Sequence, residues 1–184
     1  MPTPQAPIGS GFGAATTAAD VVSGIDLDGK TAIVTGGYSG LGRETVRAVR
    51  AAGARVIVPA RDVGRSAAAL TGIDVEIEPM DLLDPASIDT FAAKFLSSAQ
   101  PLHILINSAG IMACPVSRDA RGYEAQFATN HLGHFQLTLR LWPALVQAKG
   151  GRVVSVSSWG HHFSPVNFND PKFERRDYDS WLAY

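Results

Sequence analysis

Short apolar runs alternate along this chain with longer stretches in which apolar residues recur every three or four positions. Valine and isoleucine dominate the short runs, and this composition is typical of strands that are covered on both faces. Alternation of such strands with helical stretches predicts βαβ units and a parallel sheet. The five predicted strands are TAIVT (31–35), RVIVPA (55–60), VEIEPM (75–80), LHILIN (102–107) and RVVSVS (152–157).

The intervening stretches predict helices over 41–52, 61–70, 85–98 and 123–147. Asp84 is a suitable N-cap for the third helix, and Pro85 suits its first position. Pro143 should kink or shorten the fourth helix. Because the crossovers between parallel strands are right-handed, these elements predict an α/β fold with a doubly wound parallel sheet in the order 3-2-1-4-5.

The two ends of the chain depart from this pattern. Residues 1–24 combine prolines and glycines without periodicity, so we expect neither helix nor strand there, but an arm on a domain that spans 25–184. Its apolar residues Ile8, Phe12, Val21 and Val22 could pack on that domain or on a second copy, or the arm could be solvated. Because a polar, aromatic stretch (158–184) follows the fifth strand directly, we expect the amino-terminal part of a longer protein, with the carboxy-terminal strands missing.

Composition narrows the class of partner. The 184 residues include 16 Lys and Arg against 17 Asp and Glu, a net charge of −1, which argues against nucleic acid as the main partner. The single cysteine, Cys114, cannot form an internal disulfide. Without an apolar run of about 18 residues or a basic leader, the sequence predicts no membrane span, and we expect a cytoplasmic protein.

A glycine-rich loop joins the first predicted strand to the first predicted helix. It reads Thr35-Gly36-Gly37-Tyr38-Ser39-Gly40-Leu41-Gly42. Glycines at such a place let backbone amides approach a pyrophosphate, whose charge is stabilised by the amino-terminal end of the helix. The order strand, glycine loop, helix therefore favours a dinucleotide site over an ordinary turn. The similarly glycine-rich segment 9–13 follows no strand, and we interpret it as flexible.

The end of the second strand bears on the choice of cofactor. Enzymes that use NAD place a carboxylate there for the ribose 2′-hydroxyl, whereas this chain has Ala60 followed by Arg61. A guanidinium suits a 2′-phosphate, so the sequence favours NADP(H) over NAD(H). Asp62, one residue further on, opposes this preference.

From about Asp26 onward, the chain resembles the short-chain dehydrogenase/reductase family. The motifs that carry the resemblance are TGGYSGLG (35–42), Asp81-Leu82, Asn107-Ser108-Ala109-Gly110, Asn130 and Ser157-Ser158. Ser108 departs from the usual second asparagine of the third motif. The stretches NSAGIMACP (107–115), GYEAQFATNHLGHF (122–135) and SSWGHHF (157–163) are most similar to the retinol-dehydrogenase-like branch. This resemblance implies a Rossmann-type domain and an enzyme that interconverts a carbonyl and an alcohol on a small or medium apolar substrate.

The resemblance also implies roles for individual residues. The cofactor-binding residues it implies are Thr35, Gly36, Tyr38, Ser39, Gly40, Leu41, Gly42, Arg61, Asp81, Leu82, Asn107, Ala109 and Gly110. Asp81 would lie beside the adenine, and 107–110 beside the nicotinamide ribose. Tyr184 would transfer the proton, Ser158 would bind the substrate oxygen, and Asn130 would support the proton relay. The family's lysine would stand at position 188, beyond the last residue, so we expect no turnover by the chain as given.

Other functions can be considered for the same residues. His131, His134, His161, His162 and Cys114 lack the spacing of a metal site, and we expect none. No Gly-x-Ser-x-Gly elbow surrounds Ser158, which argues against a hydrolase. The alternatives that remain are a non-catalytic nucleotide-binding regulatory or scaffold module and, less favoured, a nucleotide-sugar epimerase or dehydratase. Phe127, Phe135, Leu137, Leu141 and Trp142 suggest core and subunit contacts, and we expect a homo-oligomer in the full-length protein.

Overall fold

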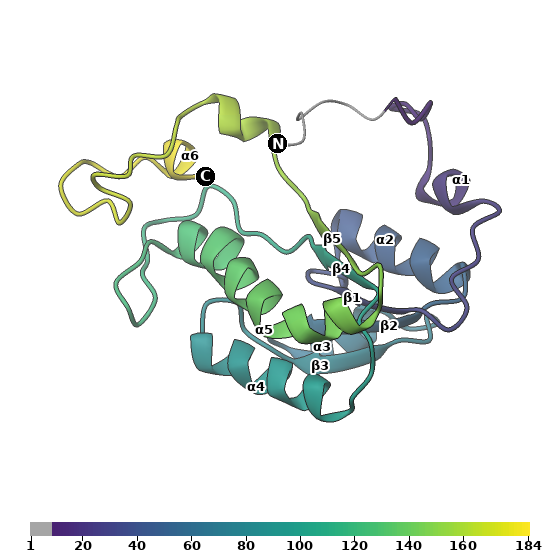
Figure 1. Cartoon of the computed structure of the whole chain (residues 1–184). Coiled ribbons are helices and arrows are strands. Elements are labelled where there is room, and N and C mark those ends of the chain that lie inside the picture. Colours follow the sequence, from purple (N-terminus) through teal and green to yellow (C-terminus); the bar gives the residue numbers. More distant parts are fainter. Residues whose placement is uncertain (1–8) are drawn as a thin grey trace.

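A five-stranded parallel sheet forms the centre of the molecule (Figure 1). The computed structural model describes residues 9–184. Its strands run in the order β3-β2-β1-β4-β5, which confirms the predicted doubly wound topology. Their bounds are Thr31–Val34 (β1), Arg55–Ala60 (β2), Glu76–Pro79 (β3), Ile104–Asn107 (β4) and Arg152–Ser155 (β5).

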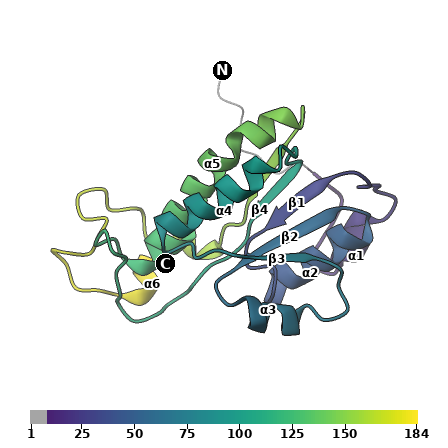
Figure 2. The same ribbon diagram turned by 90° about the horizontal axis from the view of Figure 1, so that it is seen from below.

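Helices cover both faces of this sheet (Figure 2). The α-helices are Ala18–Val22 (α1), Gly40–Ala51 (α2), Val63–Ala69 (α3), Pro85–Ser97 (α4), His134–Gln147 (α5) and Ser180–Ala183 (α6). A π-helix, Phe127–Gly133, continues directly into α5, and a 3₁₀-helix spans Trp159–His162. No helix within residues 9–184 is long and apolar enough to cross a membrane.

Alternate side chains of the central strands enter two separate hydrophobic cores. Ile33 of β1 packs with Ile57 and Leu105 against the apolar sides of α4 and α5. Its neighbours Ala32 and Val34 pack on the opposite face with residues of α2. Because successive strand residues point to opposite faces, β1 is buried on both sides and holds its carboxyl end, where Thr35 follows, in a fixed place.

Two helices differ from the prediction. The arm contains α1, because Thr17 and Asp20 form a reciprocal capping box that stabilises its first turn. Ile8 lies outside the described residues, while Phe12 and Val21 are exposed. Helix α5 runs through Pro143 to Gln147, so the proline does not shorten it. Proline removes only one backbone donor, and the buried neighbours Leu141, Ala144 and Leu145 keep this turn packed on the core.

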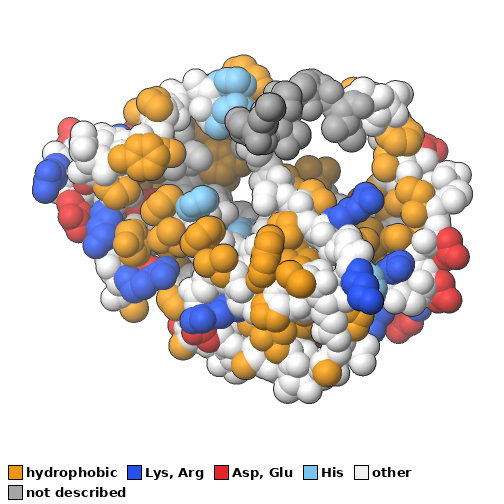
Figure 3. Space-filling view, in the orientation of Figure 1, with side chains coloured by type: hydrophobic (Ala, Val, Ile, Leu, Met, Phe, Trp, Pro, Cys, Tyr) orange, Lys and Arg blue, Asp and Glu red, His pale blue; other side chains and the backbone are white. Residues whose placement is uncertain are grey.

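The last strand and one side of α5 are open to solvent. All four residues of β5 are exposed, as expected for an edge strand with a partner on one side only. Phe135, Leu139, Trp142 and Val146 form an exposed apolar stripe along α5. Figure 3 shows hydrophobic side chains gathered over the part of the molecule where α5 runs in Figure 1.

Candidate active site

The glycine-rich loop after β1 packs too tightly for a side chain at each of its glycines except Gly40. Gly36 has φ +66°, and a Cβ there would lie 2.8 Å from the Cα of Ala109. A Cβ on Gly42 would collide with the carbonyl oxygen of Gly36. Gly40 differs, because its φ is +50° but a Cβ there would meet no atom within 4 Å. Three glycines are therefore required by the close packing of the loop, and Gly40 leaves open space beside the start of α2.

The amino-terminal end of α2 is free to bind an anion. The side chain of Ser39, the N-cap residue, makes no capping hydrogen bond, and the first turn carries no acidic residue. The first amides of a helix have no partner within the helix and carry a partial positive charge. This end of α2 is therefore suited to a phosphate group. Leu41 in the same turn is 82% exposed.

A small cavity of about 60 Å³ lies at the carboxyl ends of β1, β2 and β3. It brings together eight residues that the sequence predicts for cofactor binding: Thr35, Gly36, Tyr38, Arg61, Asp81, Leu82, Ala109 and Gly110. The other predicted loop residues, Ser39, Gly40, Leu41 and Gly42, lie at the start of α2 and outside its lining. Ligands of open parallel sheets bind outside the carboxyl ends of the strands, and this cavity occupies such a place.

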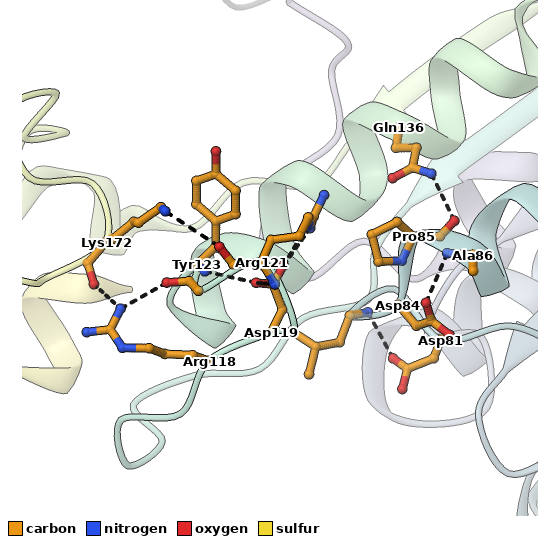
Figure 4. Close-up of polar contacts among 12 residues, drawn as sticks. Asp81, Asp84, Pro85, Ala86, Arg118, Asp119, Arg121, Tyr123, Gln136 and Lys172 are labelled. Atoms are coloured by element: carbon orange, nitrogen blue, oxygen red, sulfur yellow. Dashed lines mark hydrogen bonds and ion pairs between the residues drawn. The ribbon is translucent and has the colours of Figure 1, made fainter.

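The charged groups at this cavity differ in whether they already have a partner in the protein. The Arg61 side chain is exposed and forms no ion pair within residues 9–184. The carboxylate of Asp62 accepts from the amide of Arg65 at 2.9 Å and caps α3. Asp81 accepts from the amide of Leu83 at 2.9 Å, which fixes its carboxylate at the rim (Figure 4). The guanidinium is thus available to an anionic ligand, while the neighbouring Asp62 has a structural task.

A larger cavity of about 580 Å³ contains the predicted catalytic residues. Asn130, Ser158 and Tyr184 all line it, together with Asn107, Ala109 and Gly110. Ala109 and Gly110 also line the smaller cavity. The two cavities thus share a wall; Asp81, predicted for the adenine, lines the smaller cavity, and Asn107, predicted for the nicotinamide ribose, lines the larger one.

Asn107 ends β4 with an unused acceptor. Its side-chain amide donates to the hydroxyl of Thr138 at 3.1 Å, and the residue is 6% exposed. Its Oδ1 is buried and has no hydrogen-bond partner within the described residues. A buried acceptor without a donor costs free energy, so this atom is suited to a donor group of a bound molecule.

Asn130 lies inside the π-helix, where the α-helical ladder is interrupted. Its side chain accepts from the amide of Ile111 at 2.9 Å and donates to the carbonyl of Ile111 at 2.8 Å. These two hydrogen bonds fix the chain directly after Gly110. The side chain of Asn130 therefore supports the shared wall of the two cavities.

Ser158 and Tyr184 lie close together at Gly160. The Ser158 hydroxyl oxygen accepts from the amide of Gly160 at 3.0 Å, which leaves its proton free to donate. A Cβ on Gly160 would lie 3.1 Å from two ring carbons of Tyr184 and 3.3 Å from the Ser158 hydroxyl. The absence of a side chain at Gly160 thus lets the phenol ring pack next to the serine.

A buried polar network holds the segment that carries Tyr184. The Tyr178 hydroxyl donates to the fully buried Glu124 carboxylate at 3.0 Å and accepts from the Gln126 amide at 2.9 Å. Gln126 also donates to the carbonyl of Ser180 at 3.0 Å. Burial, with a smaller contribution from Glu124, raises the pKa of Tyr178 to about 12. This hydroxyl therefore stays protonated and serves as an anchor.

A second anchor holds an earlier part of the same segment. The guanidinium of Arg118 donates to the carbonyl oxygens of Gly122 and Lys172 (Figure 4). The neighbouring carboxylate of Asp119 accepts from the amide of Tyr123 at 2.8 Å and forms an ion pair with Arg121. These contacts join the loop before the π-helix to the loop that leads to α6.

The cavity also contains residues that the sequence does not predict. His131, His134, Phe135, Thr138 and His161 line it. Phe135 is thus a cavity residue as well as part of the exposed stripe on α5. His134 lies one helical turn after Asn130, and this spacing is the only sequence signal that could have identified it. Within residues 9–184, no three His, Cys, Asp or Glu side chains are grouped as metal ligands.

The chain is similar in sequence to known proteins. The family model described as "short chain dehydrogenase" matches residues 30–168. Human retinol dehydrogenase 12 is 42% identical over 167 residues, which cover 87% of this chain and 52% of that protein. The chain spans about half the length of the curated relatives it matches.

Two solved structures are similar in fold. An uncharacterised protein from Mycobacterium paratuberculosis superposes with a TM-score of 0.81 at 40% identity, over 92% of this chain and 60% of that one. A metagenomic short-chain oxidoreductase in complex with NADP has a TM-score of 0.64 at 29% identity, over 73% of this chain and 64% of that one.

Proposed function

Because the chain belongs to the short-chain dehydrogenase family, we propose that it is part of an NADP(H)-dependent oxidoreductase that interconverts a carbonyl and an alcohol on a small or medium apolar substrate. The observation that carries this proposal is the shared wall of the two cavities. Ala109 and Gly110 separate the Arg61 and Asp81 side from the side that holds Asn130, Ser158 and Tyr184. A dinucleotide is long enough to have one end in each cavity.

The residues present fit such a cofactor. Gly36 and Gly42 form a cradle that side chains would fill, and α2 offers amides without an acidic neighbour. The unpartnered Oδ1 of Asn107 supplies an acceptor on the nicotinamide side. Arg61, with no ion pair within residues 9–184, suits the 2′-phosphate of NADP(H).

The protein's own residues handle the proton and orient the substrate. Hydride transfer is the chemistry that the bound cofactor supplies. Ser158, whose hydroxyl proton is free, donates a hydrogen bond to the substrate oxygen and stabilises the charge that develops there. Tyr184, packed beside it on Gly160, gives its phenolic proton to that oxygen in reduction and takes it back in oxidation. Asn130 keeps the wall between the cavities in place through Ile111.

The side chains around Ser158 support the proposal of an apolar substrate. The same cavity is lined by three exposed apolar residues, Phe135, Val153 and Val156. Such walls stabilise apolar groups by removing their surface from water. We therefore expect aldehydes and ketones with hydrophobic substituents to be better substrates than sugars.

Two substitutions test this proposal in the protein expressed from its whole gene. Ser158→Ala and Tyr184→Phe should each lower NADPH consumption with apolar aldehydes by about 100-fold or more, the usual effect of losing an oxyanion donor or an acid/base group. The affinity for NADPH should change by less than about threefold, because neither hydroxyl belongs to the cofactor cradle.

Ser164→Ala and Tyr123→Phe are matched controls, because neither residue lines the cavity. They should keep normal turnover. Full turnover by the Ser158 and Tyr184 variants would contradict the assigned roles. Tight NADPH binding without turnover of any carbonyl by the unsubstituted protein would favour the non-catalytic module instead.

A further inference from the structure

His134 is a buried histidine whose two ring nitrogens contact both sides of the candidate site. It is the first residue of α5 and is 6% exposed. Its Nδ1 lies 2.9 Å from the carbonyl oxygen of Asn130, and its Nε2 lies 2.8 Å from the hydroxyl of Thr35. One partner belongs to the π-helix and the other to the cofactor loop.

The partners determine where the ring carries its proton. A carbonyl oxygen can only accept, so Nδ1 must donate to Asn130. Burial lowers the pKa of His134, which keeps the ring neutral at pH 7 despite the opposing effect of the Asn130 hydrogen bond. A neutral ring with a proton on Nδ1 has a lone pair on Nε2. The hydroxyl of Thr35 must therefore donate to Nε2.

This orientation satisfies every group around Thr35. The hydroxyl oxygen accepts from the amide of Ser108 at 2.9 Å and from the amide of Ala109 at 3.0 Å. With its proton on His134, both of its acceptor sites are used. The opposite tautomer would place three donors on this one oxygen, and its proton could reach only the carbonyl of Ile106 at 3.4 Å.

We propose that His134 is a positioning residue that sets the two walls of the active site together. Through Thr35 it orients the hydroxyl that holds Ser108 and Ala109 on the cofactor side. Through the carbonyl of Asn130 it holds the π-helix on the substrate side. Its effect on turnover rests on the proposed function, whereas its tautomer and its contacts are properties of this chain alone.

The two contacts can be separated by substitution. Asparagine at position 134 has an amide nitrogen near the place of Nδ1. His134→Asn therefore keeps the donor to the carbonyl of Asn130 and loses the acceptor for the hydroxyl of Thr35. Glutamine reaches the place of Nε2. His134→Gln therefore keeps an acceptor for the hydroxyl of Thr35 and loses the donor to the carbonyl of Asn130. His134→Phe keeps the ring shape and loses both contacts.

The first experiment needs no cofactor. In this chain labelled with ¹⁵N-histidine, NMR at pH 7 should show His134 as the neutral tautomer with its proton on Nδ1. Amide exchange at Ser108 and Ala109 should be about tenfold faster in His134→Asn than in His134→Gln, because only the former leaves the Thr35 hydroxyl without its acceptor. A proton on Nε2, or equal exchange in the two variants, would overturn the proposal.

The second experiment measures NADPH affinity of the same chains by nicotinamide fluorescence. His134→Asn and His134→Phe should raise Kd by about five- to tenfold, the effect of one hydrogen bond, while His134→Gln should stay within about twofold. In the protein from the whole gene, His134→Gln should lower kcat without changing the KM for NADPH. Equal Kd in all variants would overturn the inference, whereas absence of NADPH binding by the unsubstituted chain would overturn the proposed function and leave the NMR result to decide on His134.

Discussion

Single glycines in the loop between β1 and α2 have different tasks. Gly36 and Gly42 are required by the fold, because side chains there would collide with Ala109 and with the loop itself. Packing does not require a glycine at position 40, because a Cβ there would meet no atom within 4 Å. Gly40 is the first residue of α2. A substitution there can therefore test cofactor binding without a steric clash inside the fold.

Gly40→Val should lower NADPH affinity by about 100-fold or more, because the side chain would stand between the amides of α2 and the pyrophosphate. Gly11→Val is the matched control. Gly11 also has a positive φ, +78°, and open space around its Cβ, so it shares the backbone strain but lies in the arm. Fluorescence titration with NADPH checks both variants. Unchanged binding by Gly40→Val would show that the loop does not hold the cofactor.

Arg61 should set the choice between the two nicotinamide cofactors. Its guanidinium has no ion pair within residues 9–184, and Asp62 is engaged in capping α3. The unsubstituted chain should bind NADPH more tightly than NADH by about 10- to 100-fold, and Arg61→Ala should remove most of this difference. Parallel titrations measure it. Tighter binding of NADH would mean that Asp62 determines the preference.

Residue-level prediction from sequence depends on local motifs. The loop 35–42, Asn107 and Asn130 can be identified because they lie in short, recognisable stretches. Gln126 and His134 cannot be assigned a role in this way. Their partners, Ser180 and Thr35, lie 54 and 99 residues away in sequence, so no local pattern reports the contacts.

Among the elements, the strands and crossover helices follow from periodicity, whereas the π-helix and α6 do not. The π-helix departs from the 3.6-residue period on which helix prediction relies. Helix α6 has only four residues and is held by the network of Tyr178, Glu124 and Gln126. Contacts with distant residues therefore contribute to α6, together with its local N-cap, Asp179.

The Tyr178 network should therefore contribute to stability and to the placement of α6. Tyr178→Phe should lower the free energy of unfolding by about 1 kcal/mol, the usual net value of a buried hydrogen bond. Tyr123→Phe is the control, because its hydroxyl makes no hydrogen bond within residues 9–184. Chemical denaturation at pH 8 measures both. Equal losses in the two variants would contradict the anchoring role of Tyr178.

The same network predicts a dependence on alkaline pH. The folded state raises the pKa of Tyr178 from 10.0 to about 12, so it favours the neutral phenol. The resulting stability is fully present below pH 10 and is lost as the pH rises from about 10 to about 12. Over this range the unsubstituted chain should lose more unfolding free energy than Tyr178→Phe. Parallel losses would show that Tyr178 does not titrate differently in the folded state.

At the scale of the whole molecule, the parallel sheet brings distant parts of the sequence to one edge. The carboxyl ends of β1, β2, β3 and β4 place the loop 35–42, Arg61, Asp81 and 107–110 around two adjoining cavities. The π-helix and the segment 158–184 complete the larger cavity with Asn130, Ser158 and Tyr184. The topology is predictable from the order of the elements, and the resemblance places Ser158 and Tyr184 in the site, but the contacts that hold the last segment there are visible only in the structure.

A crystal structure of this chain with bound NADPH would show most directly whether the two cavities hold the cofactor. We expect density for the adenosine 2′-phosphate at Arg61 and for adenine beside Asp81 and Leu82. The pyrophosphate should lie at the start of α2, and the nicotinamide in the cavity of Asn107, Asn130, Ser158 and Tyr184. Nicotinamide density outside that cavity, or NADPH bound elsewhere on the chain, would contradict the proposed cofactor site.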